Sequence, residues 1–360
     1  MLLVSVTLLL TLMSLVTLHT SRVKSVEYKI ILNNQNYIQA KAAAKGGLAH
    51  GFTLARQDAN WLGAPRNQTL GAYGRASVTA VFALIPRNTL MLPLVTISST
   101  GFSNDGLAQV TMSEQGLRVP IVAVIPPAAL ISAKGFTEDV ALQLAANPNG
   151  GGPGVPISLW TALPNNLSVS DAHTCTLQAF DEHRCHLDSY TSLGQTGLDI
   201  IDDGVDFPPD LLKYVFNIAS EDWPLLKANV DLNVNNCAQL PWQQTRSIWV
   251  SGDCSLSYGQ TLGSPDEPVV LIVESGNLLM ASTSIMYGLV LMFRPPDTLN
   301  TYGVRMGDSA YINGALITNS SLDDALSNIR VRYHFGVLNT LMRDNKLQRL
   351  APVPGSWRDF

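Results

Sequence analysis

The residues best suited to chemistry form a group of histidines and cysteines near the middle of the chain: His173, Cys175, His183, Cys185 and His186. Mixed imidazole and thiolate ligands suit Zn²⁺, but the spacing is not that of a zinc finger. In an exported protein, the oxidising compartment favours a disulfide over a zinc thiolate. We therefore interpret the group as a disulfide-closed loop with exposed histidines, and a zinc site is the alternative.

Aspartates form a second group of possible metal ligands. Five of them lie in one short, turn-rich string: Asp199, Asp202, Asp203, Asp206 and Asp210. Ca²⁺ takes about 6–8 oxygen ligands, but the string lacks the D-x-D-x-D-G order of a calcium-binding loop. We interpret it as a solvated acidic turn, with a calcium site as the alternative.

No motif in the sequence indicates catalysis. The G-x-S-x-G, H-E-x-x-H and P-loop patterns are missing from the chain. His50 and His334 have no partner nearby in sequence, so we interpret them as packing or surface residues. The tryptophans are expected to anchor the core or its loops: Trp160, Trp223, Trp242 and Trp249. We expect no enzymatic activity and no cofactor, and a membrane-anchored enzyme that uses the His/Cys group is the least favoured hypothesis.

The four cysteines fall into two close pairs in the sequence. In an exported domain an even number of cysteines predicts disulfides, although four cysteines allow three connectivities. We predict the local pairs, Cys175–Cys185 and Cys237–Cys254. Loops of this size contribute about 3 kcal/mol each in the chain-entropy description.

The stretch that organises the chain is its first 21 residues, which contain no Asp, Glu, Lys or Arg. A bilayer core about 30 Å thick needs roughly 20 apolar residues in a helix. Ser and Thr residues lower the hydrophobicity of the stretch and can bond to neighbouring helices. A cleaved signal peptide and a buried helix of a soluble protein are alternatives. We predict a retained membrane anchor, with its apolar surface supplied by Leu2, Leu3, Val4, Val6, Leu8, Leu9, Leu10, Leu12, Leu15, Val16 and Leu18.

Helical periodicity continues beyond this anchor. Apolar residues recur at steps of three and four over residues 23–62, and stop signals follow. We predict one helix over residues 2–62, about 90 Å long. Its first third is apolar all round and the remainder is amphipathic. Gly46, Gly47 and Gly51 could kink or fray it.

Charge is distributed unevenly. Residues 22–62 hold six Lys/Arg and two Asp/Glu, a net of +4; the other residues hold seventeen and twenty-six, a net of −9, which together give −5. An acidic head without a broad basic patch argues against nucleic-acid binding. Basic residues directly after the anchor conflict with the positive-inside rule if the head is exported, a conflict that residues upstream of Met1 could resolve.

After the helix, the sequence changes to short Val-, Ile- and Thr-rich runs bounded by Gly and Pro, which predict strands. The fold class is α+β: a pilin-like long N-terminal helix packed on a β-rich head with a short C-terminal helix. The predicted divisions are the transmembrane or filament-core helix (1–21), its amphipathic continuation (22–62), a first β-rich part (63–154) and a second (155–360). The second part contains the disulfides and the C-terminal strand–helix tail. The Gly-rich segment 147–154 is the clearest loop or linker.

Two late segments share one pattern. SIMYGLVLM and AYINGALIT place Gly288 and Gly314 at the same offset among apolar residues. Two copies are fewer than the three or so that a solenoid needs. We therefore predict two adjacent strands of similar shape.

Both ends of the chain resemble one known family. The apolar LLVSVTLLLTLMSLVTL, followed by the Ala-rich IQAKAAAKGGLAHGF, resembles the N-terminal region of PilX-type minor pilins of type IV pili. The C-terminal VRYHFGVLNTLMR and PVPGSWRDF are similar to the closing strand, helix and tail of that group, and PGSWRDF is the sharper signal. The resemblance does not extend over residues 63–250.

The resemblance implies a helix whose apolar half packs into a filament core, with a β-rich head facing outward. It also implies inner-membrane insertion, processing by a prepilin peptidase, and incorporation into a pilus or priming of one. Prepilins carry a short basic leader ending in Gly and often a Glu five residues into the mature chain. Here that position is Ser5, and the leader would lie upstream of Met1 unless the chain is a mature-like or divergent form.

We therefore expect a non-catalytic, minor pilin-like component of type IV pilus assembly. It would sit in the inner membrane as a single-pass protein with its head in the periplasm, or in the extracellular pilus. Its expected partners are membrane lipid and, through the N-terminal helix, other pilins and pilus assembly proteins, but not nucleic acid. The alternative is a membrane-tethered periplasmic or surface adhesin that binds an unknown ligand through loops 147–154 and 199–210.

Overall fold

The structure is a computed structural model that describes residues 2–57, 61, 65–71, 74–87, 90–137, 140–146, 157–166, 171–187, 189–192, 199–238, 246–296, 302–322, 327–344 and 347–359. The predicted loop at 147–154 and the side chain of Trp242 lie outside these residues. The chain divides into two compact units: Met1–Val119 with Leu350–Phe360, and Pro120–Arg349. A long apolar N-terminal helix and a β-rich remainder with a few short helices agree with the α+β class.

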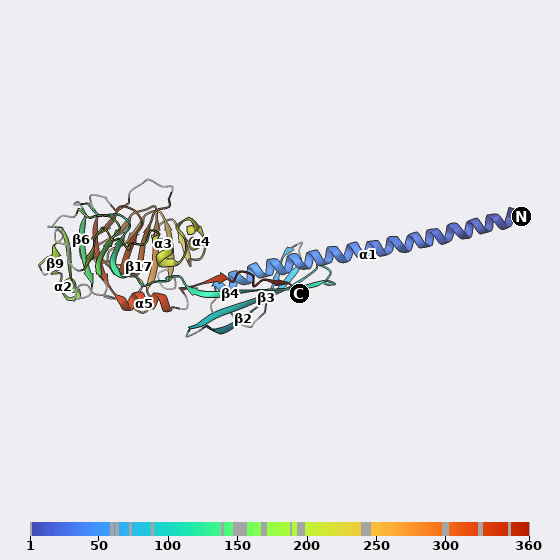
Figure 1. Cartoon of the computed structure of the whole chain (residues 1–360), viewed down its shortest axis with the longest axis horizontal. Helices are drawn as coiled ribbons and strands as arrows, with labels where there is room; N and C mark the ends of the chain where they lie inside the picture. Colours follow the sequence, from blue (N-terminus) through green and yellow to red (C-terminus); the bar gives the residue numbers. More distant parts are fainter. Residues whose placement is uncertain are drawn as a thin grey trace. The chain divides into compact units, whose positions relative to one another are not determined.

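The first unit is built on one continuous helix, α1 (Leu2–Gln57), shown in blue in Figure 1. Its 56 residues span about 84 Å at the usual rise per residue. The prediction of a single long helix is confirmed over Leu2–Gln57, and Trp61 lies outside the helix, before its predicted end at residue 62.

The C-terminal part of α1 packs on an antiparallel sheet in the order β1-β2-β3-β4-β21, with β22 also paired to β4. Alternate residues of β2 and β3 face the helix, as the two-residue period of a strand requires. Figure 1 shows β2, β3 and β4 alongside this part of the helix. The strands are β1 (Arg66–Thr69), β2 (Arg75–Arg87), β3 (Leu90–Phe102), β4 (Gln109–Pro120), β21 (Gln348–Pro352) and β22 (Arg358–Asp359).

The C-terminal tail closes this sheet. The backbone N–H of Val353 donates to the Gln115 carbonyl at 2.8 Å, and the backbone N–H of Gln115 donates to Ser356 Oγ at 3.0 Å. Asp359 accepts a hydrogen bond from Lys41 Nζ on α1 at 3.0 Å, which raises the pKa of Lys41. The PGSWRDF segment therefore links β4 to the long helix.

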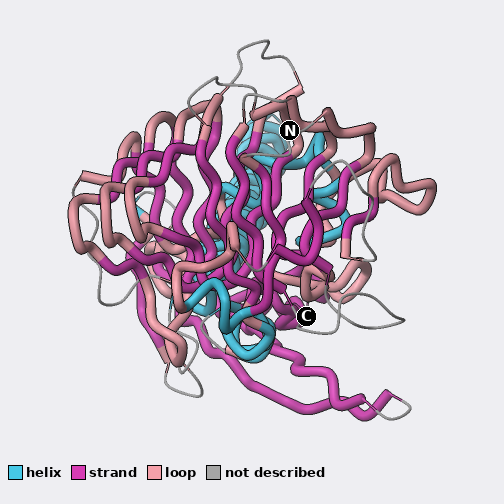
Figure 2. The backbone as a smooth tube through the Cα atoms, turned by 90° about the vertical axis from the view of Figure 1, so that its left-hand side faces the viewer, coloured by secondary structure: helices cyan, strands magenta, loops and turns pink. Residues whose placement is uncertain are grey.

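The second unit is a stack of parallel β-coils, in which each coil contributes one strand to each of two rows, and the rows join into one sheet where β19 pairs with β20. One row has the order β11-β12-β15-β17-β19-β5-β7-β10. The other has the order β13-β16-β18-β20-β6-β8. Figure 2 shows these strands side by side. Two strands lie off this pattern: β14 is parallel to β17, and β9 is antiparallel to β8.

The strands of the second unit are β5 (Ala128–Ser132), β6 (Ala141–Ala146), β7 (Ile157–Thr161), β8 (Ala172–Thr176), β9 (Ser189–Ser192), β10 (Ile200–Ile201), β11 (Leu232–Val234), β12 (Ser247–Ser251), β13 (Cys254–Leu256), β14 (Thr261–Leu262), β15 (Val269–Glu274), β16 (Leu278–Met280), β17 (Ile285–Phe293), β18 (Val304–Met306), β19 (Tyr311–Thr318) and β20 (Asn328–Tyr333). Its short helices are α2 (Leu177–Asp181), α3 (Leu211–Phe216), the 3₁₀ turn η2 (Ser220–Asp222), α4 (Trp223–Lys227) and α5 (Phe335–Arg343). Strands β12, β15, β17 and β19 are nearly continuous buried apolar runs, because both of their faces are covered.

The two similar segments lie in register on neighbouring strands. Gly288 of β17 pairs with Gly314 of β19, and the flanking residues pair one to one. A Cβ atom at Gly314 would lie 1.8 Å from the Gly288 carbonyl oxygen, and its φ of +153° also disfavours other residues. The prediction of two adjacent, similar strands is confirmed, but they belong to a coil stack, which two copies alone did not indicate.

The order of the coils differs from their order in the sequence. The last coil, β19–β20, stacks on the first, β5–β6. From β5–β6 the chain adds the next coil, β7–β8, at one end of the stack. It then forms α3 and α4 and begins the coils at the other end of the stack with β11 and β12. The backbone N–H of Ile121 donates to the Leu347 carbonyl at 2.8 Å, so the two ends of this unit adjoin.

The predicted division between the β-rich parts after residue 154 is wrong. Strands β5 and β6 precede that point and β7 follows it, yet β5 pairs with β7 within one unit. The second unit is instead inserted between β4 and β21, which are neighbours in the first sheet. Insertion at this position is compatible with both folds because the ends of the inserted unit lie together.

Candidate functional site: the N-terminal helix

The N-terminal half of α1 exposes a continuous apolar surface. Every side chain from Ser5 to Gln35 is exposed, and α1 is long and apolar enough to cross a membrane. Leu2, Leu3 and Val4 lie in the helix, although their side chains are outside the described part. The other predicted anchor residues are 49–69% exposed: Val6, Leu8, Leu9, Leu10, Leu12, Leu15, Val16 and Leu18.

Polar side chains within this stretch are satisfied by the helix itself. The hydroxyl groups of Thr11, Ser14, Thr17 and Thr20 each donate to a carbonyl three or four residues earlier, at 2.8–3.0 Å. Such bonds lower the penalty for placing a hydroxyl in an apolar environment. The stretch can therefore lie in lipid, or among other apolar helices, without unpaired hydroxyls at these four positions.

A segment that we call the uncovered segment, residues 22–35, follows the charge-free stretch. It contains three basic residues and one acidic residue, together with six exposed large apolar side chains: Val23, Val26, Tyr28, Ile30, Ile31 and Leu32. Contact with the rest of the first unit begins only at Asn36, whose Nδ2 donates to Asp105 at 2.6 Å. The predicted amphipathic stripe thus packs on the head only in its C-terminal part.

Packing on the sheet is close and depends on small residues. Ala40 and Ala44 are fully buried, and a Cβ on Gly101 of β3 would lie 2.2 Å from the Ala40 carbonyl oxygen. A Cβ on Gly47 would lie 2.1 Å from Ser99 Oγ, and one on Gly51 would lie 2.6 Å from side chains of β2 and β3. The expectation that Gly46, Gly47 and Gly51 fray the helix is wrong, because α1 continues through all three. Gly47 and Gly51 lie directly on the sheet.

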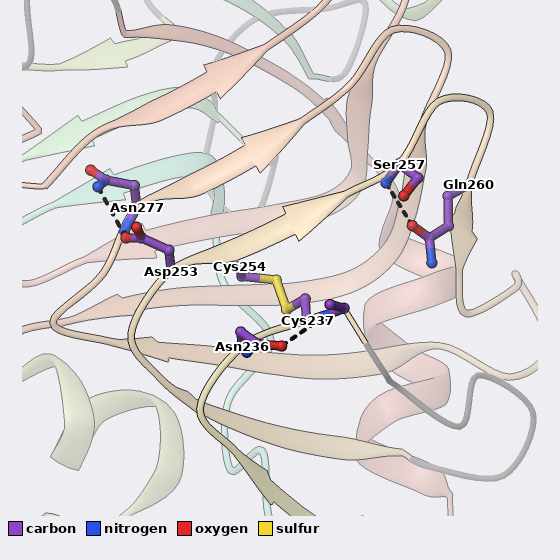
Figure 3. The surroundings of a disulfide bond; sticks show 8 residues. Asn236, Cys237, Asp253, Cys254, Ser257, Gln260 and Asn277 are labelled. Carbon is purple, nitrogen blue, oxygen red and sulfur yellow. Dashed lines mark hydrogen bonds between the residues drawn. A yellow bond between two sulfur atoms is a disulfide. The ribbon is translucent and has the colours of Figure 1, made fainter.

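The cysteines pair locally. Cys175 is joined to Cys185 and Cys237 to Cys254, which are the predicted pairs. Figure 3 shows the second disulfide beside the turn where Asp253 accepts hydrogen bonds from Asn277. Because both cysteines of the His/Cys group are in a disulfide, they cannot also serve as zinc thiolates. Within the described ranges, no three His, Cys, Asp or Glu side chains are placed to hold a metal ion.

Three aspartates of the string, Asp199, Asp202 and Asp210, have structural roles, whereas Asp203 and Asp206 are exposed in a bend and a turn, as the solvated-turn interpretation predicted. Asp199 is buried and accepts from Ser158 Oγ at 2.7 Å, and Asp202 accepts from the Asn165 backbone N–H at 2.9 Å. Asp210 caps the N-terminus of α3. Partial burial raises the pKa of Asp210, but hydrogen bonds, including those from Ser220, outweigh it and lower the pKa overall. These carboxylates bond to separate partners and do not converge on one cation.

A half-buried ion pair lies beside α4. Glu274, whose side chain is 12% exposed, accepts hydrogen bonds from Lys227 at 2.7 Å, Trp249 at 2.7 Å and Ser251 at 2.9 Å. Burial alone would raise the pKa of Glu274, but these three donors together lower it. Trp249 is fully buried and stacks on Trp223, which agrees with the prediction that the tryptophans anchor the core.

The sequence predicted the anchor and the disulfides but gave no signal for the uncovered segment. Its residues continue the same apolar stripe as the packed part, and only the tertiary structure shows where contact with the sheet begins. Comparison with known proteins found no matching family model, no matching curated protein and no matching solved structure.

Proposed function

We propose that the chain is a minor pilin-like component of type IV pilus assembly, with its head in the periplasm before assembly and its helix packed among other pilin helices afterwards. The observation that carries the proposal is the uncovered segment. The charge-free part of α1 fills a bilayer core of about 30 Å. Residues 22–35 rise about 21 Å further and expose large apolar side chains to solvent.

If the helix served only as a membrane tether, neither lipid nor protein would cover the uncovered segment. The headgroup regions bring the whole bilayer to about 40–45 Å, so one interface covers only a few ångströms of the segment. Contiguous exposed apolar surface is typical of an interaction site. A bundle of like helices covers both the charge-free stretch and the uncovered segment, and this favours assembly over simple anchoring.

The architecture of the first unit supports the same proposal. A long N-terminal helix lies on an antiparallel sheet, and the C-terminal PGSWRDF segment returns to that sheet and bonds to the helix through Lys41 and Asp359. The N-terminal segment and the PGSWRDF tail that resemble PilX-type minor pilins thus belong to the first unit, whereas VRYHFGVLNTLMR forms parts of β20 and α5 in the second.

Two charge substitutions separate assembly from anchoring. Leu12→Lys places a charge in the middle of the span and changes the insertion free energy by about 3–4 kcal/mol. Ile31→Lys places it in the uncovered segment, where lipid insertion is unaffected but packing against another helix is not. Leu107, which is 83% exposed, provides the matched control Leu107→Lys on the head.

The readouts are carbonate-resistant membrane association and the amount of protein in sheared pili. We expect Leu12→Lys to fail in both, Ile31→Lys to keep membrane association but lose pilus incorporation, and Leu107→Lys to resemble the wild type. Normal incorporation of Ile31→Lys, or no co-purification of the wild type with pili, would contradict the proposal. Removal of an upstream leader with methylation near Leu2 would support prepilin processing, whereas a new N-terminus near Arg22 would indicate a signal peptide.

A further inference from the structure

A cavity of about 290 Å³ lies in the second unit. Phe180, Asp181 and His183, from the loop closed by the Cys175–Cys185 disulfide, line it. The coils complete the lining with Thr283, Ile285, Ser309, Tyr311 and Arg330. Its volume is near the lower end of the range for small-molecule pockets, about 300–1,000 Å³.

The cavity arises from a difference between neighbouring coils. Between β18 and β19 the chain makes a turn in which Ser309 has a φ of +59°, and Thr283 occupies the same position one coil earlier with a φ of +61°. The next coil has no such turn: Asn328 pairs with Arg305 and Val331 pairs with Ile312. The seven residue steps from Arg305 on β18 to Ile312 on β19 therefore match three steps on β20, and Ser309 of the extra turn lines the cavity together with Arg330.

Arg330 has a buried guanidinium nitrogen that makes no hydrogen bond to another described residue. This nitrogen is Nε, and no ion pair joins Arg330 to another described residue. Burial lowers the pKa of this guanidinium, and the charge of Asp308 acts in the opposite direction. The neighbouring Arg332 differs, because Asp181 accepts from its Nε and Nη2 at 2.8 and 3.0 Å. Within the described part of the chain, Arg330 is therefore the arginine of this cavity that is able to take an external anion.

The other walls suit a hydroxylated ring. The rings of Phe180 and Tyr311 meet edge to face at 5.6 Å and give an aromatic surface. Thr283 and Ser309, which carry hydroxyl groups, also line the cavity. A planar guanidinium binds a carboxylate through two parallel hydrogen bonds, aromatic faces bind the C–H face of a ring, and hydroxyls bond to ring hydroxyls. The volume suits one ring rather than a chain.

We propose that this cavity binds an acidic sugar residue, with its carboxylate on Arg330 and its ring against the aromatic wall and the turn at Ser309. The inference does not depend on pilus assembly. A chain that failed to enter a pilus would still bind the sugar, and a chain that entered one could fail to bind it.

Calorimetric titration of the full-length chain in detergent micelles tests the proposal, with glucuronate, glucose and acetate as probes. We expect saturable glucuronate binding at least ten times tighter than that of glucose or acetate. Arg330→Gln should weaken glucuronate binding at least tenfold. Arg305→Gln, which removes the same charge from an exposed position on the adjacent strand, should leave it unchanged.

Three results would overturn the proposal. They are the absence of saturable glucuronate binding to the wild type, equal binding by Arg330→Gln, and acetate binding as tight as that of glucuronate, which would indicate an anion site without sugar recognition. If Arg330→Gln loses its folded circular dichroism, Arg330→Lys serves instead. It keeps the charge but not the planar fork, so binding should again weaken, and unchanged binding by Arg330→Lys would contradict the bidentate contact.

Discussion

Replacing each of the three glycines of α1 by alanine is expected to change the stability of the fold in opposite directions at neighbouring positions. Replacing Gly by Ala within a helix gains about 1 kcal/mol in propensity. At Gly46 the new Cβ meets only the flexible end of Leu70, at 3.0 Å. At Gly47 it would lie 2.1 Å from Ser99 Oγ and 2.7 Å from Ala76 Cβ, and Gly51 is enclosed similarly by β2 and β3.

The balance of these two effects sets the magnitude. We expect Gly46→Ala to be neutral or to stabilise by up to about 1 kcal/mol. Overpacking a fixed contact destabilises by about 1–3 kcal/mol or more, and the Cβ contacts at Gly47 and Gly51 are shorter than real Cβ atoms adopt. Contacts this short place both substitutions in the upper part of that range, about 2–3 kcal/mol. After the gain of about 1 kcal/mol in propensity is subtracted, Gly47→Ala and Gly51→Ala should each lose about 1–2 kcal/mol.

Amide hydrogen exchange of a peptide covering residues 40–57, measured in the full-length chain in detergent, reports this packing directly. A loss of 1–2 kcal/mol lowers protection roughly 5- to 30-fold. Gly46→Ala is the matched control, because it makes the same chemical change in the same helix. If Gly47→Ala and Gly51→Ala are protected as well as Gly46→Ala, the close-packing argument is wrong, and the glycines would act as the flexible positions that the sequence suggested.

Three further predictions concern the second unit. Because the pKa of Glu274 is lowered in the folded state, its contribution to the free energy of unfolding is present above the ordinary glutamate pKa and is lost as pH falls through the lower folded-state value. Glu274→Gln should therefore lower the free energy of unfolding by about 1–3 kcal/mol at pH 7. In denaturant titrations at acid pH, its difference from the wild type should be smaller. Replacing both Cys237 and Cys254 by Ala should lower the free energy of unfolding in urea by about 3 kcal/mol, and unchanged stability would argue against the disulfide. Gly314→Val should lose at least about 3 kcal/mol of stability, because its φ is positive and the side chain would clash with the neighbouring coil. Thermal unfolding measures this loss. The control Gly259→Ala, whose Cβ meets only a side-chain oxygen at 3.7 Å, should lose much less stability.

Much of the local structure could be predicted from the sequence. The absence of charge in the first 21 residues and the helical period beyond them indicate α1, because both are properties of one contiguous segment. The Val- and Ile-rich runs at 247–251, 269–274, 285–293 and 311–318 coincide with β12, β15, β17 and β19. The disulfide pairs were also predictable, since short loops favour local pairing. The resemblance to PilX-type minor pilins is a prediction that the structure does not test.

The candidate sites depended on contacts that no local pattern contains. The aspartates of the 199–210 string could be read as a turn, but not as acceptors for Ser158 and Asn165, which lie about forty positions earlier in the chain. The cavity beside Arg330 likewise depends on the coil of β20 lacking the turn that the preceding coils have. Such features are set by register between strands, and a sequence pattern does not specify which strand a given strand will pair with.

By itself, the sequence determined where the helix and many of the strands form, because hydrophobic period, Gly and Pro positions and charge act over a few residues at a time. Only the tertiary structure decided that β19–β20 stacks on β5–β6, that this stack is inserted between β4 and β21, and that α1 meets its sheet from Asn36 onward. These arrangements follow from burying apolar faces that lie far apart in the chain, and the same apolar residue can serve a membrane, a sheet or a neighbouring coil. Leu12, Ile31 and Leu48 all continue one apolar helix, but only Leu48 is buried within the chain.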